Sequence, residues 1–408
     1  MTPVSLMSAT SRRNKIGITA GYYAALFCIG ISASIIGPTL PGLAENTGAD
    51  IRQISLLFTA RSLGILVGAL TVSRLYDRLP GHPVLVMGLL SVALTLALVP
   101  LASQLWGLVV VMLLMGLVGS VIDVGTNTML PWLHRGNVAP YMNGLHFFFG
   151  VGAFLAPIGV AQSLLMSGDI VWAYWLLALL IVPAAAWIAL QPGPRPPTTR
   201  TSESAKRQNY PLVAAITCFF FLYVGTEVSF GGWIYTYAVQ MGLASVTTAA
   251  YLTSLFWGAL TVGRLISIPA ANRMAPRRLL AAGIVGCLVS MGLLLTQAQS
   301  TAVLWISSMG MGLSMAPLFP TTLSLAERNM PVSAKTTGWF FAGVSLGAMT
   351  LPWLVGQLFD GRGPVMAMGA IGGGVLGTAV LYGVMLLVLR RKIGSEQPHS
   401  SSGKRRRE

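Results

Sequence analysis

Twelve long apolar segments, bounded by Gly, Pro and charged residues, constrain the fold of this chain more than any other feature. A helix of about 20 apolar residues crosses the roughly 30 Å of hydrocarbon in a bilayer, so twelve such helices use about 240 residues. The chain has 408 residues, which leaves loops and tails but no room for a sizeable soluble domain. The predicted spans are 16-38, 54-76, 83-100, 105-131, 141-165, 171-190, 211-238, 246-268, 278-296, 301-325, 333-358 and 366-389.

The scarcity of charge excludes a soluble protein. Hydrophobic residues make up 54% of the chain and charged residues only 9%, whereas charged residues make up about 25% of an ordinary soluble domain. The net charge of +15 is also typical of nucleic-acid-binding proteins. Here, however, the basic residues lie in short stretches between apolar segments, as in the cytoplasmic loops of membrane proteins. We therefore expect an all-α membrane protein that contacts the lipid bilayer and no nucleic acid.

The basic residues also predict the orientation of the chain. With the N-terminus inside, the outer loops contain only Arg52 and Arg362. Cytoplasmic loops of membrane proteins carry an excess of Lys and Arg, so we expect a multi-pass protein of the cell membrane with both termini in the cytoplasm. The predicted cytoplasmic residues are Arg12, Arg13, Lys15, Arg78, Arg135, Arg195, Arg200, Lys206, Arg207, Arg273, Arg277, Arg278, Arg328, Lys335 and the tail from Arg390.

An internal repeat divides the spans into two sets of six. Seven of eight positions match between GALTVSRL at 68-75 and GALTVGRL at 258-265. We predict a cytoplasmic tail at 1-15, a six-helix bundle at 16-190, a Pro-rich linker at 191-210, a second bundle at 211-389 and a basic tail at 390-408. Parallel repeats of this kind are typical of transporters in which one bundle rocks against the other around a site near the midplane.

The sequence gives no indication of an enzyme or of a bound cofactor. No nucleophile paired with a base, no HExxH motif and no phosphate-binding loop occurs. Cys28, Cys218 and Cys287 all lie inside apolar segments and form no CxxC pair, so no metal site is predicted. We expect the chain to bind a small-molecule substrate and to act as a monomer by alternating access.

Few charged residues lie inside the predicted spans. They are Arg61 in span two, Asp123 in span four and Glu227 in span seven. A charge at the centre of a span costs about 2.5–3.5 kcal/mol, so each must face a cavity or a partner. Their uncharged polar neighbours are Asn127, Asn143, His146, Gln162 and Gln357.

Asp123 and His146 are the predicted proton-coupling residues of the first bundle, and Glu227 is that of the second. Burial among apolar neighbours favours the protonated form of a carboxyl group, so we expect Asp123 to bind and release a proton. Asn127 follows one turn later on the same face. The alternatives are a structural ion pair or cap for Asp123 and a hydrogen-bonded core residue for His146, which precedes three phenylalanines.

Span seven combines Glu227 with aromatic residues and the Gly231-Gly232 pair. Interrupted helices expose backbone groups to ligands, so Tyr223 and Trp233 are candidates to contact a solute. The alternative for Trp233 is membership of an interfacial aromatic belt. At about 1.5 Å per residue, Arg61 and Glu227 lie in the outer half of the membrane and Asp123 in the inner half. This favours an anionic substrate or Glu227 as the partner of Arg61.

The loop after span two carries Arg74, Asp77 and Arg78, and the loop after span eight carries Arg273. This pattern resembles the loop signature of the major facilitator superfamily, in which an acid and basic residues lock the inner gate. The resemblance implies gating roles for Asp77, Arg78, Arg74, its repeat counterpart Arg264, and Arg273. The second copy has Asn272 where the family has its acid.

Four short stretches resemble one branch of that superfamily, the fucose–proton symporters and sodium-dependent glucose transporters. They are DVGTN at 123-127, NGLHFFFGVGAFLAP at 143-157, YVGTE at 223-227 and FPTTLS at 319-324. The resemblance implies that Asp123 serves proton coupling and that Asn127 binds substrate. The first-span acid of the fucose symporter has no match, because residues 17-38 contain no Asp or Glu.

We therefore expect a symporter for a sugar or a similar small polar solute, coupled to H⁺, with Na⁺ as the alternative ion. The predicted substrate-binding residues are Asn127, Asn143, Arg61, Tyr223, Trp233, Gln162 and Gln357. A second hypothesis is a proton-coupled efflux antiporter for drugs or lipid-like amphiphiles. It is favoured by Ala156-Pro157-Ile158-Gly159, which partly matches the Gly-Pro-Gly signature of drug exporters.

Overall fold

The computed structural model describes residues 3–134, 138–194, 209–330 and 334–395, and every regular element in these ranges is a helix. Twelve of the helical stretches are long and apolar enough to cross a membrane, which confirms the predicted all-α, twelve-span fold class. The elements are α1 (Pro3–Ser34), α2 (Ile36–Thr47), α3 (Ile51–Ile54), α4 (Leu56–Arg78), α5 (Gly81–Leu98), η1 (Val99–Leu101), α6 (Leu105–Leu133), α7 (Ala139–Ser167), α8 (Val171–Ala189), α9 (Tyr210–Gln240), α10 (Val246–Arg273), α11 (Pro276–Thr296), α12 (Thr301–Met315), α13 (Leu318–Asn329), α14 (Ala334–Arg362) and α15 (Pro364–Ser395).

Several helices extend beyond the predicted spans, because hydropathy marks only their apolar part. The helix α1 begins at Pro3, within the predicted N-terminal tail, and α15 continues to Ser395, within the predicted basic tail. Residues 195–208 of the predicted linker and residues 396–408 of the tail lie outside the described part of the chain.

Local sequence explains where helices start and stop. The tenth span is split into α12 and α13 beside Pro317, which has no backbone N–H to continue the hydrogen-bond ladder. The short α3 is capped by Asp50, whose Oδ1 accepts from the Gln53 backbone N–H at 2.6 Å while the Gln53 side chain accepts from the Asp50 N–H at 3.1 Å. This reciprocal arrangement satisfies donors that a helix start leaves free.

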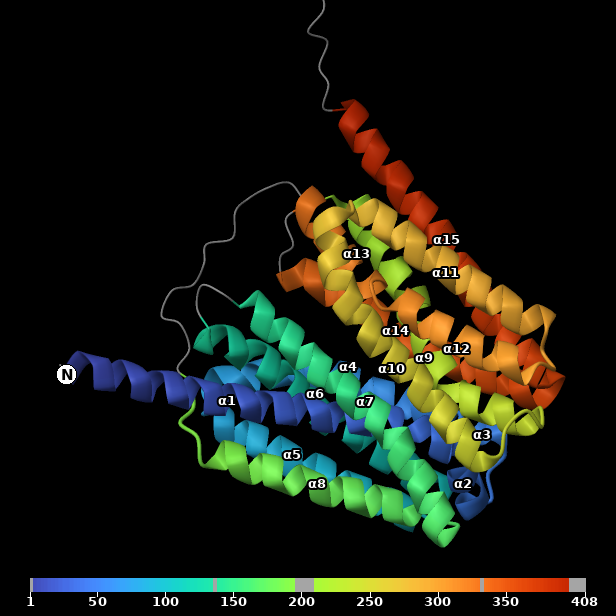
Figure 1. The fold of residues 1–408 in the computed structure, drawn as a ribbon, viewed down its shortest axis with the longest axis horizontal. Coiled ribbons are helices and arrows are strands. Elements are labelled where there is room, and N and C mark those ends of the chain that lie inside the picture. Colours follow the sequence, from blue (N-terminus) through green and yellow to red (C-terminus); the bar gives the residue numbers. More distant parts are fainter. Residues whose placement is uncertain (1–2, 135–137, 195–208, 331–333, 396–408) are drawn as a thin grey trace, which may run out of the picture.

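The helices form two bundles, α1–α8 and α9–α15 (Figure 1). Close helix pairs in the first bundle include α4 with α6 and α1 with α7, and α9 pairs closely with α14 in the second. Glycine makes this proximity possible: a Cβ built on Gly116 of α6 would lie 2.0 Å from the carbonyl oxygen of Arg61 in α4. Small residues at crossings are the usual means of close helix packing in membranes.

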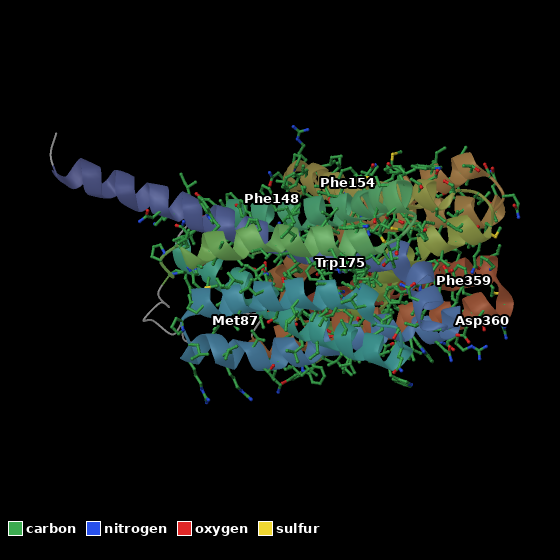
Figure 2. All side chains as sticks on the ribbon, turned by 90° about the horizontal axis from the view of Figure 1, so that it is seen from below. Met87, Phe148, Phe154, Trp175, Phe359 and Asp360 are labelled. Atoms are coloured by element: carbon green, nitrogen blue, oxygen red, sulfur yellow. The ribbon has the colours of Figure 1, made fainter. Side chains whose placement is uncertain are left out.

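The bundle surfaces are apolar, as a lipid-facing surface requires. Large apolar side chains such as Met87, Trp106 and Leu179 are between 64% and 70% exposed. Figure 2 shows the side chains along both bundles, with Phe359 and Asp360 at the end of the molecule opposite the N-terminus. That end also carries α2 and α3 (Figure 1), and we call it the α3 end.

The two bundles are joined near the α3 end. Thr59 and Ser62 of α4 donate to backbone carbonyls of α14 at 3.0 and 3.1 Å, and Gln162 of α7 donates to the Tyr251 hydroxyl of α10 at 2.7 Å. Gly37 of α2 lies against α9, since a Cβ there would be 2.8 Å from the Gly231 carbonyl oxygen. The helices of the two bundles diverge toward the opposite end (Figure 1).

Candidate functional site

A cavity of about 240 Å³ lies between the two bundles. Its walls come from α1, α2, α4, α6 and α7 on one side and from α9 and α10 on the other. Binding at an interface between repeats is typical of transporters. The lining residues are Ile29, Ser32, Ala33, Ser34, Ile36, Gly37, Phe58, Arg61, Ser62, Ile65, Met115, Gly116, Gly119, Ser120, Asp123, Phe149, Glu227, Val228, Gly231, Gly232 and Trp257.

The structure brings the three predicted intramembrane charges into this one cavity. Arg61, Asp123 and Glu227 all line it, although their predicted depths separate Asp123 from the other two. A rise-per-residue estimate of depth ignores helix tilt and the reach of a long arginine side chain. The cavity therefore combines one cationic and two acidic side chains.

Asp123 is held by its neighbour one turn along α6. The side-chain amide of Asn127 donates to Asp123 Oδ1 at 3.0 Å and to the Asp123 carbonyl oxygen at 2.9 Å. Asn127 itself is not among the residues that line the cavity. Its position fits a residue that orients the Asp123 carboxyl group toward the cavity.

Glu227 has a different environment on the opposite wall. Its side chain is buried, and the Tyr223 hydroxyl donates to Glu227 Oε2. The guanidinium of Arg264 in α10 lies within electrostatic range of Glu227 and of His146. Arg264 thus provides a positive charge near a carboxylate that lines the cavity.

Arg61 contrasts with both carboxylates, because its Nε atom is buried and has no hydrogen-bond partner in the described part of the chain. The ion pair in the described residues joins Arg52 to Asp360 and does not involve Arg61. The close packing of α4 on Gly116 fixes the backbone of Arg61 beside α6. A buried N–H donor without an acceptor is costly, so Arg61 is a candidate to contact a ligand.

Other predicted site residues lie away from the cavity. Trp233 is fully buried, donates from Nε1 to the Pro352 carbonyl at 2.9 Å and stacks on Phe359, so it joins α9 to α14. Asn143 and His146 are exposed on α7 and are not among the residues that line the cavity. This exposure contradicts the alternative of a buried core histidine.

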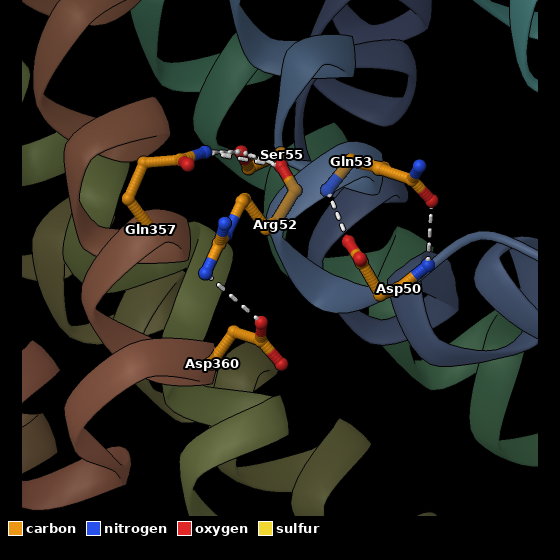
Figure 3. A network of polar contacts seen from close by, with 6 residues as sticks. All are labelled: Asp50, Arg52, Gln53, Ser55, Gln357 and Asp360. Carbon is orange, nitrogen blue, oxygen red and sulfur yellow. Dashed lines mark hydrogen bonds and ion pairs between the residues drawn. The ribbon is translucent and has the colours of Figure 1, made fainter.

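Gln357 belongs to a polar network at the α3 end (Figure 3). Its Nε2 donates to the Arg52 carbonyl oxygen at 3.2 Å and to Ser55 Oγ at 3.3 Å. In the same network, Arg52 Nη2 lies 3.4 Å from Asp360 Oδ2. Since α3 belongs to the first bundle and α14 to the second, these contacts and the Gln162 bond hold the α3 end closed.

Three of the predicted gating residues lie at the end opposite α3, whereas Arg264 lies near Glu227. Arg74 and Arg78 are exposed in the last turns of α4, and Arg273 is exposed at the end of α10. The side chain of Asp77 lies outside the described residues.

Sequence reasoning missed several cavity residues, above all Ser34, Phe149 and Trp257. The indole Nε1 of Trp257 is buried and has no hydrogen-bond partner among the described residues. One signal was present in the sequence: Trp257 directly precedes the repeated octapeptide that begins at Gly258. Serine and phenylalanine in an apolar span carry no comparable signal.

Comparison with known proteins places this architecture in a family. The family model described as Major Facilitator Superfamily matches residues 22–335. A crystal structure of the nucleoside transporter NupG superimposes with a TM-score of 0.75 at 13% identity, covering 92% of this chain and 99% of that one. This likeness shows the fold.

Curated relatives agree with the family model. The mouse sodium-dependent glucose transporter 1A is 29% identical, over 93% of this chain and 99% of its own length. The human sodium-dependent glucose transporter 1 is 28% identical over 88% of this chain and 76% of its own length. Human major facilitator superfamily domain-containing protein 4A is 24% identical over 88% of this chain and 89% of its own length. The chain is a multi-pass membrane transporter, not an enzyme, and belongs to the major facilitator superfamily.

Proposed function

We propose that the chain transports a small sugar-like solute by proton-coupled symport, with Asp123 as the coupling carboxyl group. One observation carries the proposal: Asp123 lines the same inter-bundle cavity as Arg61 and Glu227. A carboxyl group in a solute cavity exchanges its proton with whichever side of the membrane the cavity faces. Proton binding and solute binding at adjacent positions then become coupled.

The cavity has the size and polarity for a small polar solute. Its volume of about 240 Å³ is below the roughly 300–1,000 Å³ of sites for drug-sized ligands. Ser32, Ser62 and Ser120 donate their hydroxyl hydrogens to backbone carbonyls, which leaves their oxygens free to accept from solute hydroxyl groups. Phe149 and Trp257 supply aromatic faces for the solute ring.

The arrangement of the bundles supports alternating access. Contacts between α3 and α14 and between α7 and α10 close the α3 end, while the helices diverge at the opposite end (Figure 1). With the orientation that the basic loops favour, the cavity opens to the cytoplasm and both termini are cytoplasmic. We propose that the monomer in the cell membrane is the transporting unit.

Uptake into proteoliposomes with an inside-alkaline pH gradient tests the proposal, using D-glucose, L-fucose and polyols as probes. We expect accumulation of a sugar driven by the pH gradient in wild type and lost in Asp123→Asn. Accumulation driven by a sodium gradient at constant pH supports the ion named for the glucose-transporting relatives and contradicts proton coupling. Extrusion of amphiphiles without sugar uptake supports the antiporter alternative.

A further inference from the structure

Two buried hydrogen-bond donors without an acceptor belong to side chains that line the central cavity. They are Arg61 Nε of α4 and Trp257 Nε1 of α10, and neither has a partner in the described part of the chain. Guanidinium and indole nitrogens can only donate. Since more than about 90% of buried polar groups in proteins find a partner, two orphan donors on opposite walls of one cavity point to a ligand that supplies acceptors.

The protein's own carboxylates do not fill this role. Asp123 accepts from Asn127, and Glu227 accepts from Tyr223. Neither forms an ion pair with Arg61 in the described residues, although all three line the cavity. The cation of the site is therefore available to a solute.

The charges that face Asp123 determine which solute fits. Arg61 comes from α4 and Glu227 from α9, and Arg264 of α10 lies within electrostatic range of Glu227. The charges of Glu227 and Arg264 offset each other, so the site carries one unbalanced positive charge when Asp123 is protonated and none when it is ionised. One negative charge on the solute balances the protonated site, and the anion and the proton then bind together.

We propose that the solute is a monoanionic sugar acid, of the uronate or aldonate type, whose carboxylate is bound by Arg61 and Trp257. This inference rests on the proposed function and deepens it. A guanidinium matches a carboxylate in two parallel hydrogen bonds, and the indole N–H approaches the same group from the opposite wall. The serine oxygens of the cavity accept from the solute hydroxyl groups.

The test uses the full-length protein with D-glucuronate and D-gluconate as acidic probes and D-glucose as the neutral match. Both acids are expected to raise the thermal unfolding temperature of the purified protein and to enter proteoliposomes with a kcat/KM at least tenfold above that of D-glucose. Arg61→Gln is expected to abolish the thermal shift. It is also expected to lower the ratio of the kcat/KM for the acids to that for D-glucose at least tenfold. Arg61→Lys keeps the charge and retains part of the preference.

Two further variants separate anion binding from loss of fold. Trp257→Phe removes the indole donor but keeps an aromatic face, so it is expected to lower the kcat/KM of the acids several-fold more than that of D-glucose. Arg328→Gln, at an exposed arginine of α13, is the matched control and leaves binding and transport of all three probes unaffected. If the Arg61 variants misfold, the Trp257→Phe kinetics and the thermal shifts of the wild type test the anion site.

The outcomes separate the two proposals. Gradient-driven glucose uptake, with no thermal shift by either acid and unchanged selectivity in Arg61→Gln, overturns the anionic solute and leaves the sugar symporter standing. If no probe is transported, the proposed function fails, and the thermal shift still decides the anion site. A thermal shift that depends on Arg61 supports the anion site. The absence of a shift with both acids overturns it.

Discussion

Arg52 Nη2 lies 3.4 Å from Asp360 Oδ2 and so links α3 of the first bundle to α14 of the second (Figure 3). Both side chains are about half exposed, at 54% and 42%, and exposed ion pairs contribute about 0.2–1 kcal/mol. We therefore expect this pair to adjust the balance between open and closed states of the α3 end without locking it.

Breaking this pair is expected to open the cavity toward the α3 end up to about fivefold more often, the factor that about 1 kcal/mol gives. The measurement is the labelling rate of Ser34→Cys, in a cysteine-free background, by an impermeant thiol reagent added from the α3 side. Arg52→Asp is expected to accelerate labelling, and Arg52→Asp with Asp360→Arg to restore it. Arg362→Ala, at the same end of α14, is the control. Equal rates in Arg52→Asp and wild type contradict the gating role.

Glu227→Gln is expected to impair transport while the protein still folds. The substitution keeps the shape of the side chain but removes the charge that Tyr223 and Arg264 stabilise. Hydrogen bonds to charged groups contribute about 1.5–3 kcal/mol, so initial uptake rates should fall about tenfold or more. Glu327→Gln, at an exposed glutamate of α13, is the matched control. Unchanged uptake in a folded Glu227→Gln protein removes Glu227 from the mechanism.

Gly37→Ala is expected to destabilise the closed α3 end. The added methyl group would lie 2.8 Å from the Gly231 carbonyl oxygen, and overpacking of this kind costs about 1–3 kcal/mol. Cavity labelling from the α3 side should therefore increase. Gly107→Ala provides the contrast, because nothing lies within 4 Å of a Cβ at that position, and it should leave labelling unchanged. An equal response in both variants rules out a role for the α2–α9 contact.

The topology is expected to place both termini and the linker in the cytoplasm. Ser202→Cys and Ser400→Cys, at positions outside the described residues, should resist an impermeant thiol reagent in intact cells and react after permeabilisation. Ser103→Cys, at an exposed serine between α5 and α6, should react from outside. Labelling of Ser202→Cys or Ser400→Cys in intact cells refutes the orientation.

The fold was predictable because its determinants are patterns in the sequence and do not depend on how the helices pack. Apolar length identifies the twelve spans, and the octapeptide repeat at Gly68 and Gly258 relates the two halves. The intramembrane charges also stand out, since Arg61, Asp123 and Glu227 are costly wherever they do not face a cavity. All three line the same cavity in the structure.

The remaining site residues could not be chosen from sequence, because helix rotation depends on packing between helices. Trp233 and Trp257 are both tryptophans in apolar spans, yet the first binds the Pro352 carbonyl inside its own bundle and the second lines the cavity. Gln357 likewise bonds to α3 at the junction of the bundles. Nothing in their sequence neighbourhoods distinguishes these roles.

The central claim is that Asp123 couples solute movement to the proton gradient, and Asp123→Asn tests it most directly. Asparagine mimics the permanently protonated carboxyl group and can still contact Asn127. Reconstituted wild type should accumulate solute up to about tenfold for each pH unit of gradient, since one proton per solute then supplies about 1.4 kcal/mol. The variant should accumulate none while still exchanging labelled solute between equally loaded sides. Accumulation by Asp123→Asn equal to that of wild type under the same pH gradient would contradict the account.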